Sequence, residues 1–342
     1  MLQIRNETPF TPGLFLFPDE RGVDTLYPVL KATFLIRDGS SLAVAEKQRP
    51  VVMKDEYEGE PGASSLRYSS EAHLLKPGTD VLLVGQAHAP RGRPVDSALV
   101  SVKVGALRQV LRVFGERHWK GGLFSPTPSS PEPFRTMPLI WERAFGGIYE
   151  TAKGQLQGEA RNPVGQGFRG KRSASEMIDR ALPNIEDPLR LIGSIGDAPS
   201  PVGVGALAPS WEPRKAHAGT YDEAWRKRRA PYLPRDFRAE FFHVAPPALR
   251  ATEGLKGGEP VELLGVSSSG VERFELPRCE LAVVVRIAGR PEKVPLQLET
   301  VLLEPGEKRV CLTWRGALGC DKRALQVEEV SFSLKSLHGG RG

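Results

Sequence analysis

The last third of the sequence alternates short apolar runs with turn residues, and this rhythm restricts that part of the chain to β structure. Runs such as ELAVVVRIAG (280–289) and ALQVEEVSFSLK (324–335) have the length of single strands. Glycine, proline or charged residues separate these runs from their neighbours, as they do EPVELLGV, ERFELP and KVPLQLETVLLEPGEKRVCLTWRG within 259–316. Short strands at this close spacing predict a sandwich of antiparallel sheets.

The first third also predicts strands, joined by recognisable turns. Residues 27–46 place apolar runs on both sides of Asp38-Gly39, a dipeptide typical of hairpins. DVLLVGQAHAP (80–90) is typical of a buried strand that ends at a proline. Residues 97–119 form two runs around Gly105-Ala106. Three valines at 100, 102 and 104 share one face of the first run, but Val110 shares its face with Arg112 and Phe114, so the return run alternates imperfectly.

The middle of the chain, residues 121–255, has a different character. It is rich in proline and glycine, and four of the five tryptophans lie within it or at its edge: Trp119, Trp141, Trp211 and Trp225. Disordered segments lack such apolar groups, so we expect an ordered cover over the sheets. Ser173 and Glu176 have the spacing of a capping box and predict a short helix that ends before Pro183. A second helix is expected from Thr220 or Asp222 to just before Pro231.

These patterns divide the chain into three regions: an N-terminal β region (1–120), a loop-rich middle segment with short helices (121–255) and a C-terminal β region (256–338). We predict a mainly β fold, with sandwich-like antiparallel sheets from both terminal thirds and the middle segment packed across them. The pattern leaves open whether the β regions form one body or two closely packed domains.

Composition indicates an ordinary globular protein and a cytoplasmic location. Hydrophobic residues make up 40% of the chain and charged residues 26%, with a net charge of +6. Three cysteines at wide spacing suit a reducing compartment and give no disulfide framework. The N-terminus does not resemble a signal peptide, and no apolar run reaches the length of a membrane span.

Candidate catalytic motifs are weak throughout. The segment GQGFRGK (165–171) satisfies G-x-G-x-x-G, but GEARNPV precedes it where a nucleotide site needs a buried strand, so we interpret it as a glycine-rich turn. The neighbouring acids Glu186-Asp187 and Asp222-Glu223 project in different directions and do not form a facing catalytic pair. The six histidines lack zinc-site spacing, and no G-x-S-x-G is present. We therefore predict no catalytic residues, no metal and no cofactor.

Two segments are candidates for binding another protein. LIWERAFGG (139–147) places Trp141 and Phe145 four residues apart, either as anchors buried together that pin a loop or as interface hot spots. Arg226, Lys227, Arg228 and Arg229 form the one dense basic run. That run is interpreted as the solvated face of the second helix or as a surface for an acidic partner, and nucleic acid is a weaker alternative because no stacking aromatics are interleaved with it.

Several motifs occur in an order that resembles the bacterial domain-of-unknown-function family 2169. They are IWERAFGG (140–147), NPVGQGF (162–168), LPNIEDP (182–188), AGTYDEAW (218–225), LPRDF (233–237) and FFHVAPP (241–247). The resemblance implies a role in type VI secretion, as an accessory adaptor or chaperone that loads a toxic effector onto the PAAR tip or the trimeric spike protein. It carries over no catalytic residue. The motif positions enter as candidates for fold or interface: Trp141, Arg143, Phe145, Asn162, Pro163, Asn184, Glu186, Asp187, Tyr221, Asp222 and Trp225.

The resulting hypothesis is a non-enzymatic, cytoplasmic adaptor that binds an effector or a spike-tip protein and does not bind membranes. Cargo could meet an aromatic surface on the β scaffold or extend an edge strand. The alternatives are a hydrolase with its site in the middle loops, a structural component of the secreted particle, and a nucleic-acid-binding protein.

Overall fold

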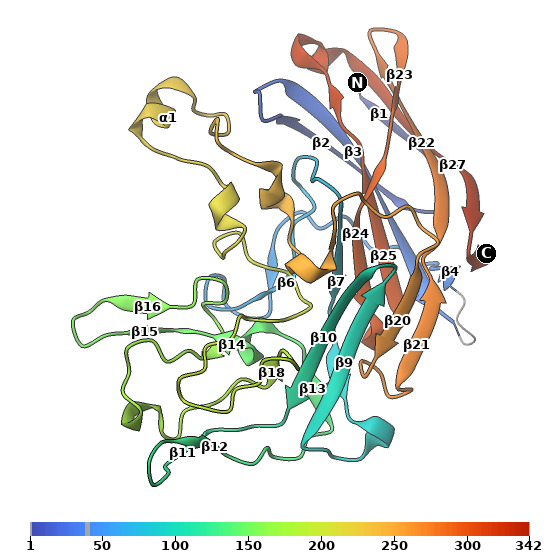
Figure 1. Cartoon of the computed structure of the whole chain (residues 1–342). Coiled ribbons are helices and arrows are strands. Elements are labelled where there is room, and N and C mark those ends of the chain that lie inside the picture. The colour runs from blue at the N-terminus through green and yellow to red at the C-terminus, as the bar shows by residue number, and fades with distance from the viewer. Residues whose placement is uncertain (1, 38–41, 342) are drawn as a thin grey trace.

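The computed structural model describes residues 2–37 and 42–341, and it confirms the mainly β prediction. The strands form a curved body on one side of the molecule, and the loop-rich middle segment lies on the other side (Figure 1). The predicted hairpin turn at Asp38-Gly39 lies outside the described residues. The strands on either side of it, β3 (Asp24–Ile36) and β4 (Leu42–Val44), pair antiparallel.

The nine-stranded sheet is the largest, and it has β3 near its centre. Beside β3 lies β25 (Arg309–Arg315), followed by β24 (Gln297–Glu304) and β7 (Thr79–Leu83). The sheet is completed by β2 (Thr11–Pro18), β4, β19 (Arg250–Ala251), β26 (Leu318–Gly319) and β28 (Gly340–Arg341). Most pairs are antiparallel, but β24 runs parallel to β7.

Two further sheets also combine the two ends of the chain. The five-stranded sheet has the order β18 (Ile185–Glu186), β10 (Leu107–Phe114), β9 (Ser97–Val104), β20 (Pro260–Leu264) and β21 (Val271–Glu275). The four-stranded sheet has the order β1 (Gln3–Glu7), β27 (Val327–His338), β22 (Arg278–Ile287) and β23 (Arg290–Val294), with β1 parallel to β27. The N-terminal and C-terminal thirds therefore share all three sheets.

The expected hairpin around Gly105-Ala106 forms between β9 and β10. Val100, Val102 and Val104 are fully buried in the main core, as their shared face predicts. On β10 the buried residues are Leu111 and Val113, and the face with Val110, Arg112 and Phe114 is half-buried. The imperfect alternation thus marks the outer face of that strand.

Short two-stranded pairs and single helical turns build the middle segment and its surroundings. The pairs are β5 (Glu56–Tyr57) with β6 (Leu66–Tyr68), β8 (Gln86–His88) with β13 (Thr136–Pro138), β11 (Trp119–Lys120) with β12 (Thr127–Pro128), β14 (Phe145–Gly146) with β17 (Gln166–Gly167), and β15 (Ile148–Glu150) with β16 (Leu156–Gly158). The 3₁₀ turns are η1 (Pro90–Gly92), η2 (Trp141–Arg143), η3 (Ser175–Met177), η4 (Lys215–His217), η5 (Ala239–Phe242), η6 (Pro247–Leu249), η7 (Pro305–Glu307) and η8 (Asp321–Gln326).

The second predicted helix exists, and the first was predicted too long. α1 (Glu223–Arg228) begins after Asp222 and ends before Pro231. The capping box at Ser173 forms, with the Glu176 carboxylate accepting from the Ser173 N–H at 2.7 Å, but it starts only the single turn η3. Asp179 then adopts a left-handed conformation (φ 63°), which ends the helix and lets Met177 reach a small core.

Candidate functional site

The IWERAFGG loop is a buried anchor of the fold. Trp141 is 4% exposed, packs edge-on against Trp211 and donates from Nε1 to the Gly205 carbonyl at 3.2 Å. Phe145 is equally buried but belongs to a separate small core with Trp119. The two rings are therefore buried in different cores, and not together as expected. Because both are buried, neither is available as an interface hot spot.

Asn162 ties this loop to the segment that crosses it. Its side chain is fully buried, and Nδ2 donates to the carbonyls of Trp141 and Phe145 at 2.8 and 3.0 Å. The backbone carbonyl of Asn162 accepts a hydrogen bond from the N–H of Gly147. The next residue, Pro163, is half-buried. Asn162 thus satisfies backbone groups that an irregular loop leaves without regular partners.

Arg143 and Asn184 form a second link in the same region. Arg143 Nη1 donates to Asn184 Oδ1 at 3.0 Å and to Glu116 Oε1 at 2.6 Å. Asn184 is fully buried and also accepts from Gln166 Nε2 at 3.0 Å. These polar residues join four chain segments and leave little free hydrogen-bonding capacity for a ligand.

The acids at 186 and 187 have separate structural roles. Glu186 is buried against the Arg117 guanidinium and accepts from the Ile192 N–H at 2.8 Å. Burial raises the pKa of Glu186, and the charge of Arg117 opposes this rise. Asp187 accepts from the Leu189 N–H and shapes a surface turn. The two carboxylates do not share a partner.

The glycines of GQGFRGK permit close contact between chain segments. A Cβ on Gly165 would lie 2.6 Å from the Ala144 carbonyl oxygen, and one on Gly167 would lie 2.7 Å from Pro183 Cδ. No helix continues directly from this segment, and the next helical element is the single turn η3, which begins only at Ser175. Within the described chain the motif is therefore a turn with tight backbone crossings and has neither the strand nor the helix of a nucleotide site.

Residues 218–237, here called the α1 arm, carry the predicted site residues that remain exposed. The arm extends away from the sheets (Figure 1). Asp222 caps α1 by accepting from the Trp225 N–H at 2.7 Å, as its position before the helix predicts. Tyr221 is 53% exposed, and its ring lies 4.7 Å from the Trp225 ring at 69°. The arm therefore presents an aromatic pair at the surface.

The basic run divides in two on this arm. Arg226, Lys227 and Arg228 are exposed, and Lys227 pairs with Glu223 at 2.8 Å on the helix surface. Arg229 does not belong to the basic patch, because Nη2 donates to the Glu20 carbonyl at 2.6 Å and Nε to the Leu233 carbonyl at 2.8 Å. It fastens the arm to the turn between β2 and β3.

A buried ionic network beneath the cover was not expected from the sequence. On one face of the nine-stranded sheet, Lys31 pairs with Glu71 at 2.7 Å. Arg315 binds both oxygens of Glu299, at 2.8 and 3.0 Å, and all four side chains are almost fully buried. Lys31, Glu299 and Arg315 lie on β3, β24 and β25, whereas Glu71 lies in the irregular segment before β7. Glu299 and Arg315 belong to the β24–β25 hairpin, but Lys31 and Glu71 are 40 residues apart, so no local pattern pairs these two.

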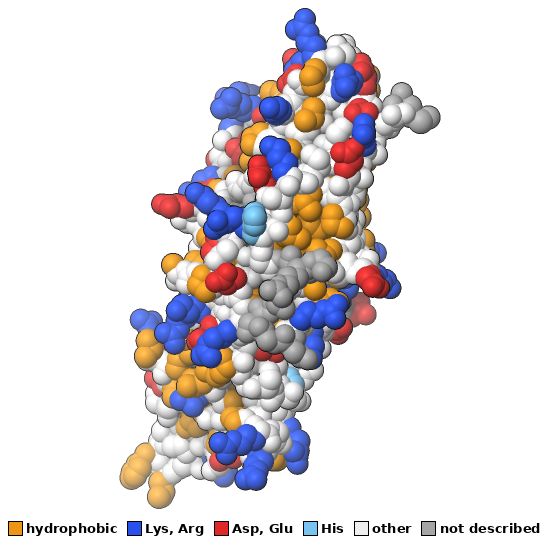
Figure 2. Space-filling view, turned by 90° about the vertical axis from the view of Figure 1, so that its right-hand side faces the viewer, with side chains coloured by type: hydrophobic (Ala, Val, Ile, Leu, Met, Phe, Trp, Pro, Cys, Tyr) orange, Lys and Arg blue, Asp and Glu red, His pale blue; other side chains and the backbone are white. Residues whose placement is uncertain are grey.

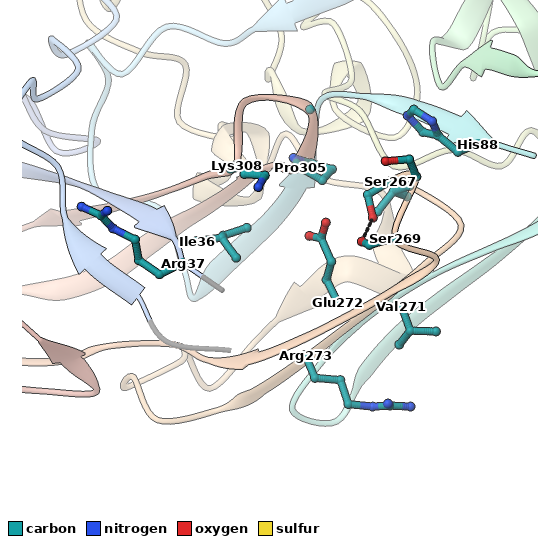
Figure 3. Close-up of a pocket in the computed structure, with 13 residues that line it drawn as sticks. Ile36, Arg37, His88, Ser267, Ser269, Val271, Glu272, Arg273, Pro305 and Lys308 are labelled. Carbon is teal, nitrogen blue, oxygen red and sulfur yellow. Dashed lines mark hydrogen bonds between the residues drawn. The ribbon is translucent and has the colours of Figure 1, made fainter. Parts of the chain in front are cut away.

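A polar pocket of about 430 Å³ opens where β8, β21 and the turn η7 meet (Figure 3). The Glu272 carboxylate points into it, and Ser267 and Ser269 share a hydrogen bond of 2.7 Å. His88 lies at one side, but in the described structure its ring has no hydrogen bond to these serines or to Glu272. The pocket thus holds serine, histidine and carboxylate without the contacts that activate a nucleophile.

The face that carries β27 and the C-terminus is mixed in charge. Figure 2 shows lysines and arginines interspersed with acids over this face, and hydrophobic side chains between them. Among the described residues, no group of three or more potential ligands could hold a metal ion, and no helix is long and apolar enough to cross a membrane.

The sequence profile of one bacterial family matches residues 21–315. Its description is "Uncharacterized protein conserved in bacteria (DUF2169)". No curated protein and no solved structure matches the chain. The match spans most of the strands described above, including the motifs of the middle segment.

Proposed function

This chain belongs to the DUF2169 family of bacterial proteins, and from that membership we propose that it is a non-enzymatic adaptor of type VI secretion. It binds a toxic effector in the cytoplasm and helps load it onto the PAAR tip or the trimeric spike protein. The cargo is a protein with an acidic surface that includes exposed apolar groups.

The observation that carries this proposal is the α1 arm. Burial removes four of the predicted site residues from the surface: Trp141, Phe145, Asn162 and Asn184. Tyr221, in contrast, is exposed beside Trp225. The exposed side chains of the basic run, Arg226, Lys227 and Arg228, follow directly. Aromatic side chains and arginine are enriched at protein interfaces, because they combine apolar area with directed or charge-assisted hydrogen bonds. The attachment through Arg229 holds this surface in place before a partner arrives.

Co-purification tests the proposal. The tagged chain is expressed with the effector and spike-tip proteins encoded beside it, and each candidate cargo is also expressed alone. We expect one of them to remain bound and to lose solubility when the adaptor is omitted. A cargo that is soluble alone and is never retained contradicts the proposal, and hydrolase screening would then be the next experiment.

Arm variants locate the contact. Tyr221→Ala, and a triple change of Arg226, Lys227 and Arg228 to Gln, should each release the cargo while the chain stays folded. The matched control is Arg190→Gln, which removes an exposed positive charge outside the arm.

Two alternatives give different outcomes. A structural component of the particle would appear in the secreted fraction together with the spike. A nucleic-acid-binding protein would retain DNA or RNA with a steep salt dependence, which the triple change would flatten.

A further inference from the structure

A second pocket, of about 260 Å³, lies in the middle segment, and we call it the arginine pocket. The chain reversals at Gly146-Gly147 and Gly165–Gly167 form one wall, and Arg172 and Arg180 form the other. Two of the family-like motifs, IWERAFGG and NPVGQGF, thus meet at this pocket. None of its lining residues was predicted as a site from the sequence.

Neither arginine forms a close ion pair with a carboxylate among the described residues, although the charge of Glu176 attracts both. In the part of the chain that the structure describes, no acid lies within 4 Å of either guanidinium. Arg180 donates from Nε to the Glu176 carbonyl at 2.6 Å, and Arg172 contacts the Met177 sulfur at 3.7 Å. The nearby Glu176 carboxylate is bonded to the N–H and hydroxyl of Ser173.

Arg172 is held in one orientation before any ligand arrives. Its Cζ lies 3.9 Å from the centre of the Tyr149 ring, a cation–π contact. Burial and then the positive charge of Arg180 lower the pKa of Arg172. Two guanidinium groups that repel each other at a fixed site would gain from a shared anion, because bidentate binding of a carboxylate neutralises charge and uses the planar donors.

The rim of the pocket is apolar, which favours a protein ligand. Ile148 lines the pocket and is 56% exposed, and Leu156 is 72% exposed on the same face of the β15–β16 hairpin. On the other side Ile178 is exposed next to the loop between β11 and β12, whose Leu123 and Phe124 are almost fully exposed. That loop lies at the lower end in Figure 1, and hydrophobic side chains protrude at this end in Figure 2.

We propose that the arginine pocket binds a carboxylate of a protein partner, with apolar residues beside that carboxylate packing on Ile148 and Ile178. Arg172 and Arg180 hold the carboxylate, and the glycine wall lets the partner's main chain approach. The inference rests on the proposed function in one respect, namely that the ligand is part of a partner protein. It adds a contact site separate from the α1 arm.

The test uses the full chain and three fluorescent peptides that contain leucine. One alternates leucine with aspartate and has an amidated C-terminus, the second has asparagine in place of aspartate, and the third has asparagine with a free C-terminal carboxylate. We expect the first or the third to bind and the second to bind at least about tenfold more weakly, since a hydrogen bond to a charged group contributes about 1.5 to 3 kcal/mol. Which acid peptide binds distinguishes a side-chain carboxylate from a chain terminus.

Variants of the full chain place the binding in the pocket. Arg172→Gln combined with Arg180→Gln should weaken binding of the acid peptide by at least about tenfold. Arg190→Gln should leave the affinity for this peptide unchanged. Because loss of the Tyr149 contact could disturb the fold, Arg180→Glu alone is tested with a leucine–lysine peptide, which should bind this variant better than the wild type. Equal binding of the acid and asparagine peptides, or unchanged binding by the double variant, overturns the inference. Tighter binding of an oligothymidylate than of any peptide also overturns it.

The two proposals fail separately. If the double variant retains its natural cargo and the peptides do not bind, the inference fails and the adaptor function stands. If the peptides bind as expected while no encoded neighbour co-purifies, the arginine pocket stands and the adaptor function fails.

Discussion

Asp80 on β7 is joined to His243 of the middle segment, with Asp80 Oδ1 2.7 Å from His243 Nδ1 and both side chains buried. The other carboxylate oxygen accepts from the Val244 N–H at 2.7 Å and from Lys76 Nζ at 3.0 Å. Asp80 thus fastens two covering segments to the nine-stranded sheet, and its contacts suggest how the fold responds to mutation and to pH.

We expect Asp80→Asn to lower the free energy of unfolding by about 3 to 5 kcal/mol, because it leaves the Lys76 ammonium buried without its partner. Urea unfolding monitored by tryptophan fluorescence measures the change. Asp179→Asn is the matched control, because Asp179 is exposed and asparagine tolerates its left-handed backbone. Equal stability of the two variants would contradict the role given to Asp80.

Stability should fall in acid in two stages. Burial and the charges of Arg315 and Lys76 lower the pKa of His73 well below 6.5, so the folded chain holds this ring neutral. Burial alone would raise the pKa of Asp80, but Lys76 and the bonds from His243 and Val244 lower it below 3.8. For both groups the unfolded chain binds more protons, so stability is lost as the pH falls, first below 6.5 and then below 3.8.

Replacing His73 separates these stages. In His73→Gln the free energy of unfolding should decline less than in the wild type between about pH 7 and pH 5, where His217, whose pKa burial also lowers, still contributes. Urea midpoints measured at a series of pH values check this expectation. Curves of equal slope for the two proteins would show that His73 does not titrate as described.

Asn162→Ala removes both bonds that the side chain donates to Trp141 and Phe145. We expect a loss of about 2 kcal/mol, since two buried carbonyls lose a donor, and a weaker near-ultraviolet circular dichroism signal from the loosened indole. A variant with wild-type stability and an unchanged near-ultraviolet spectrum would mean that the loop does not depend on this residue.

Gly167→Ala should destabilise the chain by more than Gly62→Ala. Both glycines have positive φ, at 91° and 80°, so both substitutions carry backbone strain of about 1 kcal/mol. A Cβ at position 167 would also meet Pro183 Cδ at 2.7 Å, whereas one at position 62 meets no atom within 4 Å. The difference between the two unfolding free energies isolates the close crossing, and a difference near zero would argue against it.

Arg229→Gln should release the α1 arm and leave the body intact. Its guanidinium supplies the bonds to Glu20 and Leu233, so amide exchange within 223–232 should rise while the melting temperature changes little. Hydrogen–deuterium exchange with mass spectrometry measures the exchange in the arm and in the sheets, and thermal unfolding monitored by circular dichroism measures the melting temperature. Unchanged exchange in the arm would show that other contacts hold it.

Local chemistry explains which elements the sequence could predict. Asp222 before α1 and Gly105 between β9 and β10 act within a few residues, so the pattern alone identifies the cap and the hairpin. The helix expected after Ser173 has a true capping box as well, but burial of Met177 and Leu182 in one small core overrides it. Tertiary packing therefore determined the length of that helical element.

The site residues divide in the same way. Exposure of Tyr221 and burial of Trp141 follow from which segments cross them, and composition cannot distinguish the two. Lys31 on β3 pairs with Glu71 in the irregular segment before β7, and no local pattern brings these two segments together. Arg172 and Arg180 can be recognised as a candidate site only once the structure shows that they line one pocket together with the glycine wall.

The interleaving of the two ends of the chain has a consequence for synthesis. β3 and β7 emerge early from the ribosome, but β24 and β25, which lie between them, are made more than 200 residues later. Until then both strands present unpaired backbone edges, which invite association with other chains. Contacts of such long sequence separation also make folding slow. The largest sheet can close only after nearly the whole chain has left the ribosome, so these edges stay open for most of the time that synthesis takes.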